Sequence, residues 1–229
     1  MSEIALAVKA TLPYLSEVSQ QKLCVFYDML IDWNTRMNLT AIVEPIEVAQ
    51  KHFADSILPE KLIKKDASVI DVGTGAGFPG IPLSIARPDI KLTLMDALQK
   101  RVTFLEAVCK EIGLSVPCVH ARAEEAGKNP LYRARFDAAL SRAVASASQL
   151  TELTVPFLKQ NGVSLMYKGP QAEEELKAAE NALHKLRSCG KIVAFDAEWG
   201  KRRVIMVEKN APTPDMYPRA SGIMKKKPL

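Results

Sequence analysis

Apolar positions recur with two different periods along the chain, and the first period is helical. In residues 1–65 the apolar side chains lie three or four residues apart, as do Leu23, Phe26 and Leu30, which would form one face of an amphipathic helix. A second helical stretch is predicted near residues 48–62. We therefore expect an N-terminal helical region, residues 1–65, that packs on the core of the protein.

Between residues 66 and 210 the pattern changes to short β-branched runs that alternate with helical segments. Strands are expected at residues 68–72, 91–95, 116–119, 136–140, 163–167, 191–195 and 204–207. Helices are expected near residues 81–87, 98–112, 148–158 and 172–186. This alternation predicts a parallel sheet with helices on both faces. The last two strands flank Trp199-Gly200 and read as a hairpin. The prediction is therefore an α/β fold with a doubly wound, Rossmann-like sheet of seven strands, the last one antiparallel, as in methyltransferases.

The composition is that of a soluble globular protein. Hydrophobic residues make up 48% of the 229 positions and charged residues 25%. No apolar run approaches the roughly 20 residues that span a bilayer, so no membrane association is expected. The four cysteines lie far apart and form no CxxC pair. We interpret them as reduced thiols of a cytosolic protein and expect no metal site.

Positive charge gathers at the end of the chain. The net charge is +5, and residues 201–229 hold eight Lys or Arg residues against two acidic ones. Such a basic end indicates an anionic partner, with a solvated, disordered end as the alternative. The segment 211–229, which contains four prolines, is predicted to be a basic, irregular tail.

A glycine-rich loop directly follows the first predicted strand. It runs Asp71-Val72-Gly73-Thr74-Gly75-Ala76-Gly77-Phe78-Pro79-Gly80. By its letters it also fits a dinucleotide fingerprint, so an NAD-dependent oxidoreductase is one alternative. A pyrophosphate would be repelled by Asp71 at the strand end, whereas S-adenosylmethionine has no phosphate and carries two positive groups. The loop therefore favours S-adenosylmethionine, with Asp71, Gly73, Gly75 and Gly77 as contacts. A loop-stabilising role is the alternative for Asp71.

Four further residues follow the strands at the same edge of the expected sheet, where ligands bind. Asp96 ends the second strand and would accept hydrogen bonds from ribose hydroxyls, unless it only caps the next helix. Ala123 and Glu124 follow the third strand, where adenine would lie, although they could simply begin a helix. Arg142 follows the fourth strand and could clamp a carboxylate or a nucleic-acid group, with a structural ion pair as the alternative.

Several segments together resemble the small-subunit (16S) ribosomal RNA guanine-N7 methyltransferases, once called glucose-inhibited division protein B. The segments are Trp33-Asn34-x-x-x-Asn38-Leu39-Thr40, His52-x-x-Asp55-Ser56, the loop from Asp71 to Pro82, Lys100-Arg101-Val102-x-Phe104-Leu105, Ser141-Arg142-Ala143, Lys168-Gly169, Tyr217-Pro218-Arg219 and the ending Lys227-Pro228-Leu229. The resemblance implies a monomeric, cytoplasmic enzyme whose substrate is 16S ribosomal RNA or the small ribosomal subunit. It places cofactor contacts on Gly73, Phe78, Ala123, Glu124 and Arg142.

Methylation at guanine N7 makes few chemical demands on the protein. N7 has an in-plane lone pair and no proton to lose, so no general base is required. Arg142 and Lys168 are candidate donors to O6 or to nearby phosphates. Asn38, His52 and Arg219 are further candidates for substrate binding. His52 and Asp55 lie three apart on a predicted helix and so share a face, and for these two a structural pair is the favoured interpretation.

Two alternatives keep the predicted fold and change the function. One is a non-catalytic RNA-binding protein on a degenerate methyltransferase fold, which the intact glycine loop disfavours. The other is a methyltransferase for small molecules or proteins, which the basic end and the resemblance disfavour.

Overall fold

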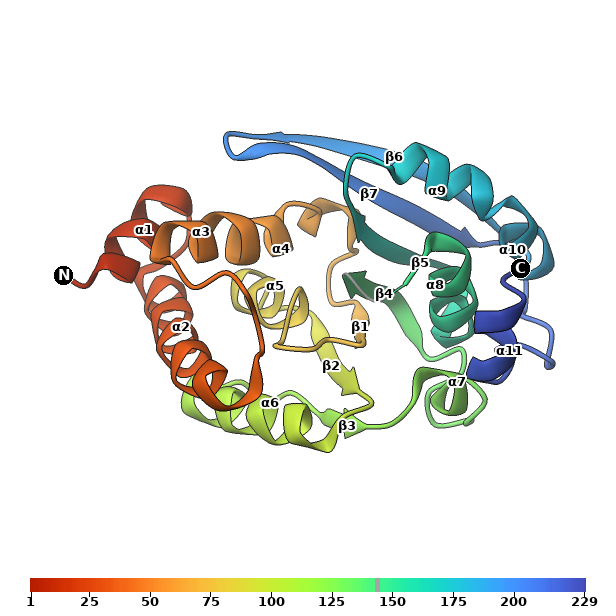
Figure 1. Ribbon diagram of the computed structural model, residues 1–229, viewed down its shortest axis with the longest axis horizontal. Helices are drawn as coiled ribbons and strands as arrows, with labels where there is room; N and C mark the ends of the chain where they lie inside the picture. The colour runs from red at the N-terminus through yellow and green to blue at the C-terminus, as the bar shows by residue number, and fades with distance from the viewer. Residues whose placement is uncertain (143–144) are drawn as a thin grey trace.

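Seven strands form one sheet in the computed structural model, which describes residues 1–142 and 145–229 (Figure 1). The strands are β1 (Ser68–Val72), β2 (Lys91–Asp96), β3 (Cys118–His120), β4 (Phe136–Arg142), β5 (Leu158–Lys168), β6 (Ser188–Ala197) and β7 (Gly200–Lys209). Their order is β3-β2-β1-β4-β5-β7-β6. All seven expected strands are present. Ala143, part of one segment of the family resemblance, lies outside the described residues.

The sheet is parallel except at one end. β1 pairs in parallel with β2 and β4, and β4 pairs in parallel with β5. β7 runs antiparallel to both β5 and β6, as the predicted hairpin requires. The fold class expected from the sequence is therefore confirmed, including the antiparallel end.

Alternate residues of each strand enter two separate hydrophobic cores. Val69 and Leu94 belong to the core on one face of the sheet, whereas Ile70 and Met95 belong to the core on the other. The first face is covered by α5 (Gly80–Ala86) and α6 (Gln99–Glu111), and the second by α8 (Ala147–Thr154), α9 (Ala172–Ala178) and α10 (Glu180–Lys185).

The helix expected at residues 148–158 is shorter than predicted. It ends at Thr154 and is followed by a 3-10 turn, Val155–Phe157, from which β5 starts at Leu158. Pro156 explains the difference, because proline lacks the N–H that would continue the helical ladder. A short helix that was only an alternative in the sequence, α7 (Ala123–Ala126), follows β3.

The N-terminal helices share a core with the sheet. They are α1 (Glu3–Thr11), α2 (Glu17–Met37), α3 (Pro45–Val48) and α4 (Asp55–Ile57), and a π-helical turn (Ala49–Ala54) joins the last two. Phe26 of α2 and Phe53 of the π turn contact Phe78 of the glycine loop, with ring centroids 5.2 Å and 6.2 Å from it. These helices thus cover the glycine loop from one side. In the described part of the chain, no helix has the length and apolar character that crossing a membrane requires.

The C-terminal tail is packed on the second face, and its residues 211–220 have no helix or strand. It contains α11 (Ser221–Lys226), and Tyr217 and Met224 are buried. Arg133 donates hydrogen bonds to the carbonyl oxygens of Thr213 and Tyr217 at 2.9 Å and 2.8 Å. These contacts give the basic end a fixed path along α7 and α8 (Figure 1).

Candidate functional site

A cavity of roughly 1050 Å³ opens at the carboxyl edge of the sheet. Its walls come from the glycine loop, the residues after β2, the ends of β4 and β5, the π-helical turn and the β6–β7 hairpin. Ligands of open α/β sheets bind at this edge. The volume is enough for a nucleotide-sized cofactor together with part of a second molecule.

The glycines of the loop have different roles. Gly73 and Gly75 line the cavity, and both have positive φ angles, 70° and 61°. A Cβ added at Gly75 would meet nothing within 4 Å, so a ligand can approach the backbone there. A Cβ at Gly77 would lie 2.5 Å from the side chain of Ile81. Gly77 therefore makes room for α5 and does not line the cavity, unlike its predicted role as a cofactor contact.

Asp71 stabilises the loop from below. Its side chain is fully buried, and Oδ2 accepts hydrogen bonds from Thr74 Oγ1 at 2.7 Å and Gly80 N at 2.8 Å. This geometry is the alternative that the sequence left open. Burial raises the pKa of Asp71 to about 6, although both hydrogen bonds oppose the rise. The other oxygen, Oδ1, is buried and finds no hydrogen-bond donor among the described residues.

Asp96 joins the glycine loop to the turn that precedes α6. Oδ1 accepts from Leu98 N at 2.9 Å, and Oδ2 accepts from Gly75 N at 2.9 Å, whereas the contact with ribose stays a prediction. Its side chain also lines the cavity. Arg101, which also lines the cavity, lies 3.5 Å from Oδ2 of Asp96. Asp96 therefore links the glycine loop to the wall of the cavity.

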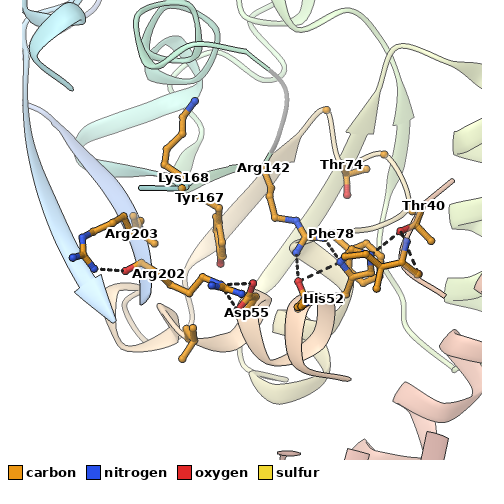
Figure 2. Close-up of a pocket in the computed structure, with 18 of the residues that line it drawn as sticks. Thr40, His52, Asp55, Thr74, Phe78, Arg142, Tyr167, Lys168, Arg202 and Arg203 are labelled. Carbon is orange, nitrogen blue, oxygen red and sulfur yellow. Dashed lines mark hydrogen bonds and ion pairs between the residues drawn. The ribbon is translucent and has the colours of Figure 1, made fainter. Parts of the chain in front are cut away.

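Arg142, His52 and Phe78 lie next to one another in the cavity wall (Figure 2). The guanidinium carbon of Arg142 lies 4.8 Å above the Phe78 ring, and the His52 ring stacks on Phe78 at 4.5 Å. Arg142 donates to Nδ1 of His52 at 3.2 Å and to the Lys51 carbonyl at 3.3 Å. In the described residues Arg142 has no carboxylate partner, so the structural ion pair considered for it is not formed there.

His52 is an uncharged ring at neutral pH. Burial, followed by the charge of Arg142, lowers its pKa to about 4. Since a guanidinium only donates, the neutral ring accepts at Nδ1 and carries its proton on Nε2, which lies 2.8 Å from Thr40 Oγ1. His52 occupies the π-helical turn, a conformation that is frequent at functional sites.

Asp55 does not pair with His52. It binds the hairpin instead, because its carboxylate accepts hydrogen bonds from Trp199 Nε1 at 2.5 Å and from Arg202 Nε at 2.8 Å and 3.0 Å. The interaction joins residues that are 144 and 147 positions apart. The structural pair expected between His52 and Asp55 is therefore replaced by two separate sets of partners.

Lys168 lines the cavity but points away from Phe78 and His52 (Figure 2). Its ammonium group lies 2.7 Å from both the Ala145 carbonyl and a carboxylate oxygen of Glu175. These bonds neutralise the charge of Lys168, so Arg142 is the better placed of the two candidate donors.

Six predicted site residues do not contribute to the cavity wall: Asp71 and Gly77, described above, and Asn38, Ala123, Glu124 and Arg219. Asn38 ends α2 in the left-handed conformation, with φ 49°. Ala123 and Glu124 begin α7 after β3. Arg219 forms a bidentate ion pair with Glu152, whose side chain is 1% exposed. A guanidinium held by a buried carboxylate is poorly placed to bind RNA, so the structure does not support the predicted substrate contact of Arg219.

The cavity wall is strongly cationic, which the sequence only partly indicated. Three carboxylates, those of Asp55, Asp96 and Glu175, line it together with seven Lys or Arg side chains: Lys51, Arg101, Arg142, Lys168, Lys201, Arg202 and Arg203. The run Lys201-Arg202-Arg203 was visible in the sequence but was counted with the basic end. No group of three potential metal ligands is found among the described residues.

Two solved structures that are similar to this chain in fold are methyltransferases. A methyltransferase from Pyrococcus furiosus superposes with a TM-score of 0.55 at 13% identity, covering 83% of this chain and 99% of its own. An S-adenosylmethionine-dependent O-methyltransferase from Thermotoga maritima gives a TM-score of 0.54 at 16% identity, covering 81% of this chain and 72% of its own. The fold is therefore that of the S-adenosylmethionine-dependent methyltransferases.

Sequence comparison narrows this class to one family. Residues 19–204 match the family model for rRNA small subunit methyltransferase G. The curated relative from Alkaliphilus metalliredigens, ribosomal RNA small subunit methyltransferase G, is 43% identical over 94% of this chain and 93% of its own. The relative of the same name from Desulforamulus reducens is 45% identical over 89% of this chain and 88% of its own. The chain belongs to the rRNA small subunit methyltransferase G family.

Proposed function

We propose that this protein transfers a methyl group from S-adenosylmethionine to N7 of a guanine in 16S ribosomal RNA. The observation that carries the proposal is the family match over residues 19–204, joined to a cavity in which the glycine loop meets a cationic wall. The relatives are named for the RNA of the small ribosomal subunit. The choice of guanine N7 comes from the family resemblance and from the chemistry of the site.

The residues at the carboxyl edge fit S-adenosylmethionine. Gly75 leaves open space where a ligand can reach the backbone, and the unpartnered Oδ1 of Asp71 provides a buried negative group near that loop. The groups that would hold the cofactor are Gly73, Gly75, Phe78, Asp96 and Arg142, with Ala123 and Glu124 towards the adenine. When bound, S-adenosylmethionine would supply a methyl group on a positively charged sulfonium, and a neutral lone pair can take that methyl group while the sulfur leaves as an uncharged thioether.

The remaining chemistry is positioning and not proton transfer. No residue has to remove a proton, because N7 of guanine already carries a free lone pair. His52, uncharged at neutral pH and fixed by Thr40, matches this requirement. Arg142 engages two of its groups with His52 and Lys51 and can donate further N–H bonds to the O6 edge of the base. Correct placement of two reactants contributes roughly 7–11 kcal/mol to a rate enhancement.

The base has to leave its stack to enter the cavity. A guanine within a helix would be extruded, and one in a loop would meet the protein directly. Phe78 itself is buried, and it supports His52 and Arg142, which lie against its ring. We propose that the part of the cavity beside His52 and Arg142 receives the target guanine. The resemblance further implies a cytoplasmic monomer. Light scattering of the purified protein tests the oligomeric state.

The test is a map of methylated guanines in 16S ribosomal RNA. Small subunits from cells that lack this protein are incubated with purified protein and S-adenosylmethionine, and the RNA is digested and analysed by mass spectrometry. We expect one N7-methylguanine that requires both additions. The variant Arg142→Ala should remain folded, by circular dichroism, and give none. Methylation of another atom, or none with wild-type protein, would contradict the proposal.

A further inference from the structure

The β6–β7 hairpin extends beyond the rest of the sheet. β5 pairs with β7 only over residues 203–208, whereas the pairing of β6 with β7 continues as far as Ala197 and Gly200. The hairpin tip, defined here as residues 195–202, therefore overhangs the sheet edge. Figure 1 shows the hairpin reaching across the top of the molecule towards the N-terminal helices.

One carboxylate fastens this tip to the N-terminal region. Asp55, directly after the π-helical turn, accepts hydrogen bonds from both Trp199 and Arg202. The side chain of Asp55 is 14% exposed and that of Arg202 is 26% exposed, so the contact is shielded from solvent. The tip is therefore held in one position against the cavity, and Asp55 neutralises the charge of Arg202.

Two other cations near this contact in the sequence also line the cavity. Lys201 precedes Arg202, is exposed, and forms no ion pair with the described residues. Lys51 lies four residues before Asp55 on the same helical segment, also lines the cavity, and contacts only the partly exposed Glu47. Both lysines line the cavity, and each is close in sequence to one partner of the Asp55–Arg202 contact.

Three neighbouring cations also have carboxylate partners, as Lys51 has in the partly exposed Glu47, whereas Lys201 has none among the described residues. Arg203 contacts Glu173 at 3.6 Å, Arg101 contacts the buried Asp96, and Lys168 is bonded to Glu175. Exposed lysines on a fixed support are suited to phosphates, because an ammonium group makes a strong charge contact without demanding one geometry.

We propose that Lys201 and Lys51 form a binding site for RNA phosphates that flank the target nucleotide, with Asp55 as the residue that positions it. The inference rests on the proposed function, since it assumes that the cavity receives a nucleotide of RNA. The site holds the strand at the cavity wall while the base enters towards Phe78 and Arg142. Its ligand is the RNA backbone, so it contributes affinity and orientation but no base specificity.

The experiment measures RNA affinity over a salt series for wild type, Lys201→Ala, Lys51→Ala and the double variant. Each lost phosphate contact lowers the salt slope by about 0.7–0.9. We expect that decrease for each single variant, about twice as much for the double variant, and unchanged affinity for S-adenosylmethionine. Lys191→Ala is the matched control, because Lys191 is an exposed lysine of the same hairpin outside the cavity. It should behave as wild type.

The positioning role of Asp55 has a separate readout. In an Asp55→Asn background, Lys201→Ala should change the salt slope by less than half as much as in wild type, because the tip is no longer held. If Asp55→Asn does not fold, the lysine variants alone decide the proposal. Equal slopes for Lys201→Ala and Lys191→Ala overturn it, as does a loss of cofactor affinity, which would make the lysines cofactor ligands. The map of methylated guanines tests the proposed function separately. If wild-type protein methylates the RNA and the lysine variants keep the salt slope of wild type, only the phosphate site is overturned and the proposed function stands.

Discussion

Two basic segments close the chain, the β6–β7 hairpin and the tail 211–229, and the structure uses their arginines in different ways. Arg202 of the hairpin and Arg219 of the tail each bind a carboxylate through two or more hydrogen bonds. The partner of Arg202 belongs to the cavity wall, whereas the partner of Arg219, Glu152, is buried under the tail. The first contact shapes a binding site and the second attaches the chain end.

The difference shows that positive charge in a sequence does not by itself locate an anion-binding surface. Both segments contributed equally to the expectation of an RNA-binding end. In the fold, Lys201 of the hairpin lines the cavity, whereas Arg219 of the tail forms an ion pair with the buried Glu152. The following predictions test this division of roles.

The largest expected effect is on stability, from Arg219→Ala. The substitution removes the guanidinium from the buried carboxylate of Glu152, which keeps only the backbone N–H of residue 219, and the loss of such a partner typically costs about 3–5 kcal/mol. For a chain of this length that corresponds to a fall in Tm of roughly 6–20 °C. Thermal unfolding measures it, with Lys225→Ala as the exposed control. A Tm equal to that of the control would mean that the tail is not held by this contact.

A smaller coupling is expected between Asp55 and Arg202. The two side chains are partly exposed, so we expect an interaction energy of about 1–2 kcal/mol in a double-mutant cycle with Asp55→Asn and Arg202→Gln. Urea unfolding of the four proteins gives the value. Additive effects would show that the hairpin tip is not fastened by this pair.

The stability of the protein should also depend on pH through His52, which lines the cavity. The pKa of His52 is lowered from 6.5 to about 4, so the unfolded chain binds a proton more readily than the folded one between these values. The contribution of His52 to the free energy of unfolding is therefore fully present above pH 6.5. It is lost as the pH falls towards 4, and the loss is on the order of 1 kcal/mol at pH 5.5.

The variant His52→Gln isolates this effect. Asp71 works in the opposite direction, because its pKa is raised to about 6 and the folded state gains stability as the pH falls through that value. Both proteins retain Asp71, so the difference between their unfolding free energies at pH 7 and pH 5.5 reports His52 alone. Identical pH profiles would contradict the lowered pKa.

The smallest effect is expected from the tail lysines. Lys225, Lys226 and Lys227 are exposed and lie outside the cavity wall, so their simultaneous replacement by Ala should change stability by no more than about 0.5 kcal/mol. The salt slope of RNA binding should fall less than in Lys201→Ala. A larger decrease would return an RNA-binding role to the tail.

Much of the fold followed from local patterns. The spacing of apolar residues located all seven strands, and Trp199-Gly200 located the hairpin that makes the last strand antiparallel. The glycine loop was also evident, because it joins a buried strand to a helix at the sheet edge where ligands bind. Helix ends were less certain where a single residue decides them, as Pro156 does.

The partners of the charged residues needed the tertiary structure. Sequence placed Asp71, Asp96 and Arg142 at one sheet edge, because the carboxyl ends of parallel strands meet there. It could not give Asp55 its hairpin partners, which lie more than 140 residues away, or assign Arg219 to Glu152. Periodicity reports which face of an element is buried, whereas the choice among distant carboxylates depends on how the elements pack. The sequence therefore determined the sheet and the glycine loop, and only the packing decided which cations line the cavity.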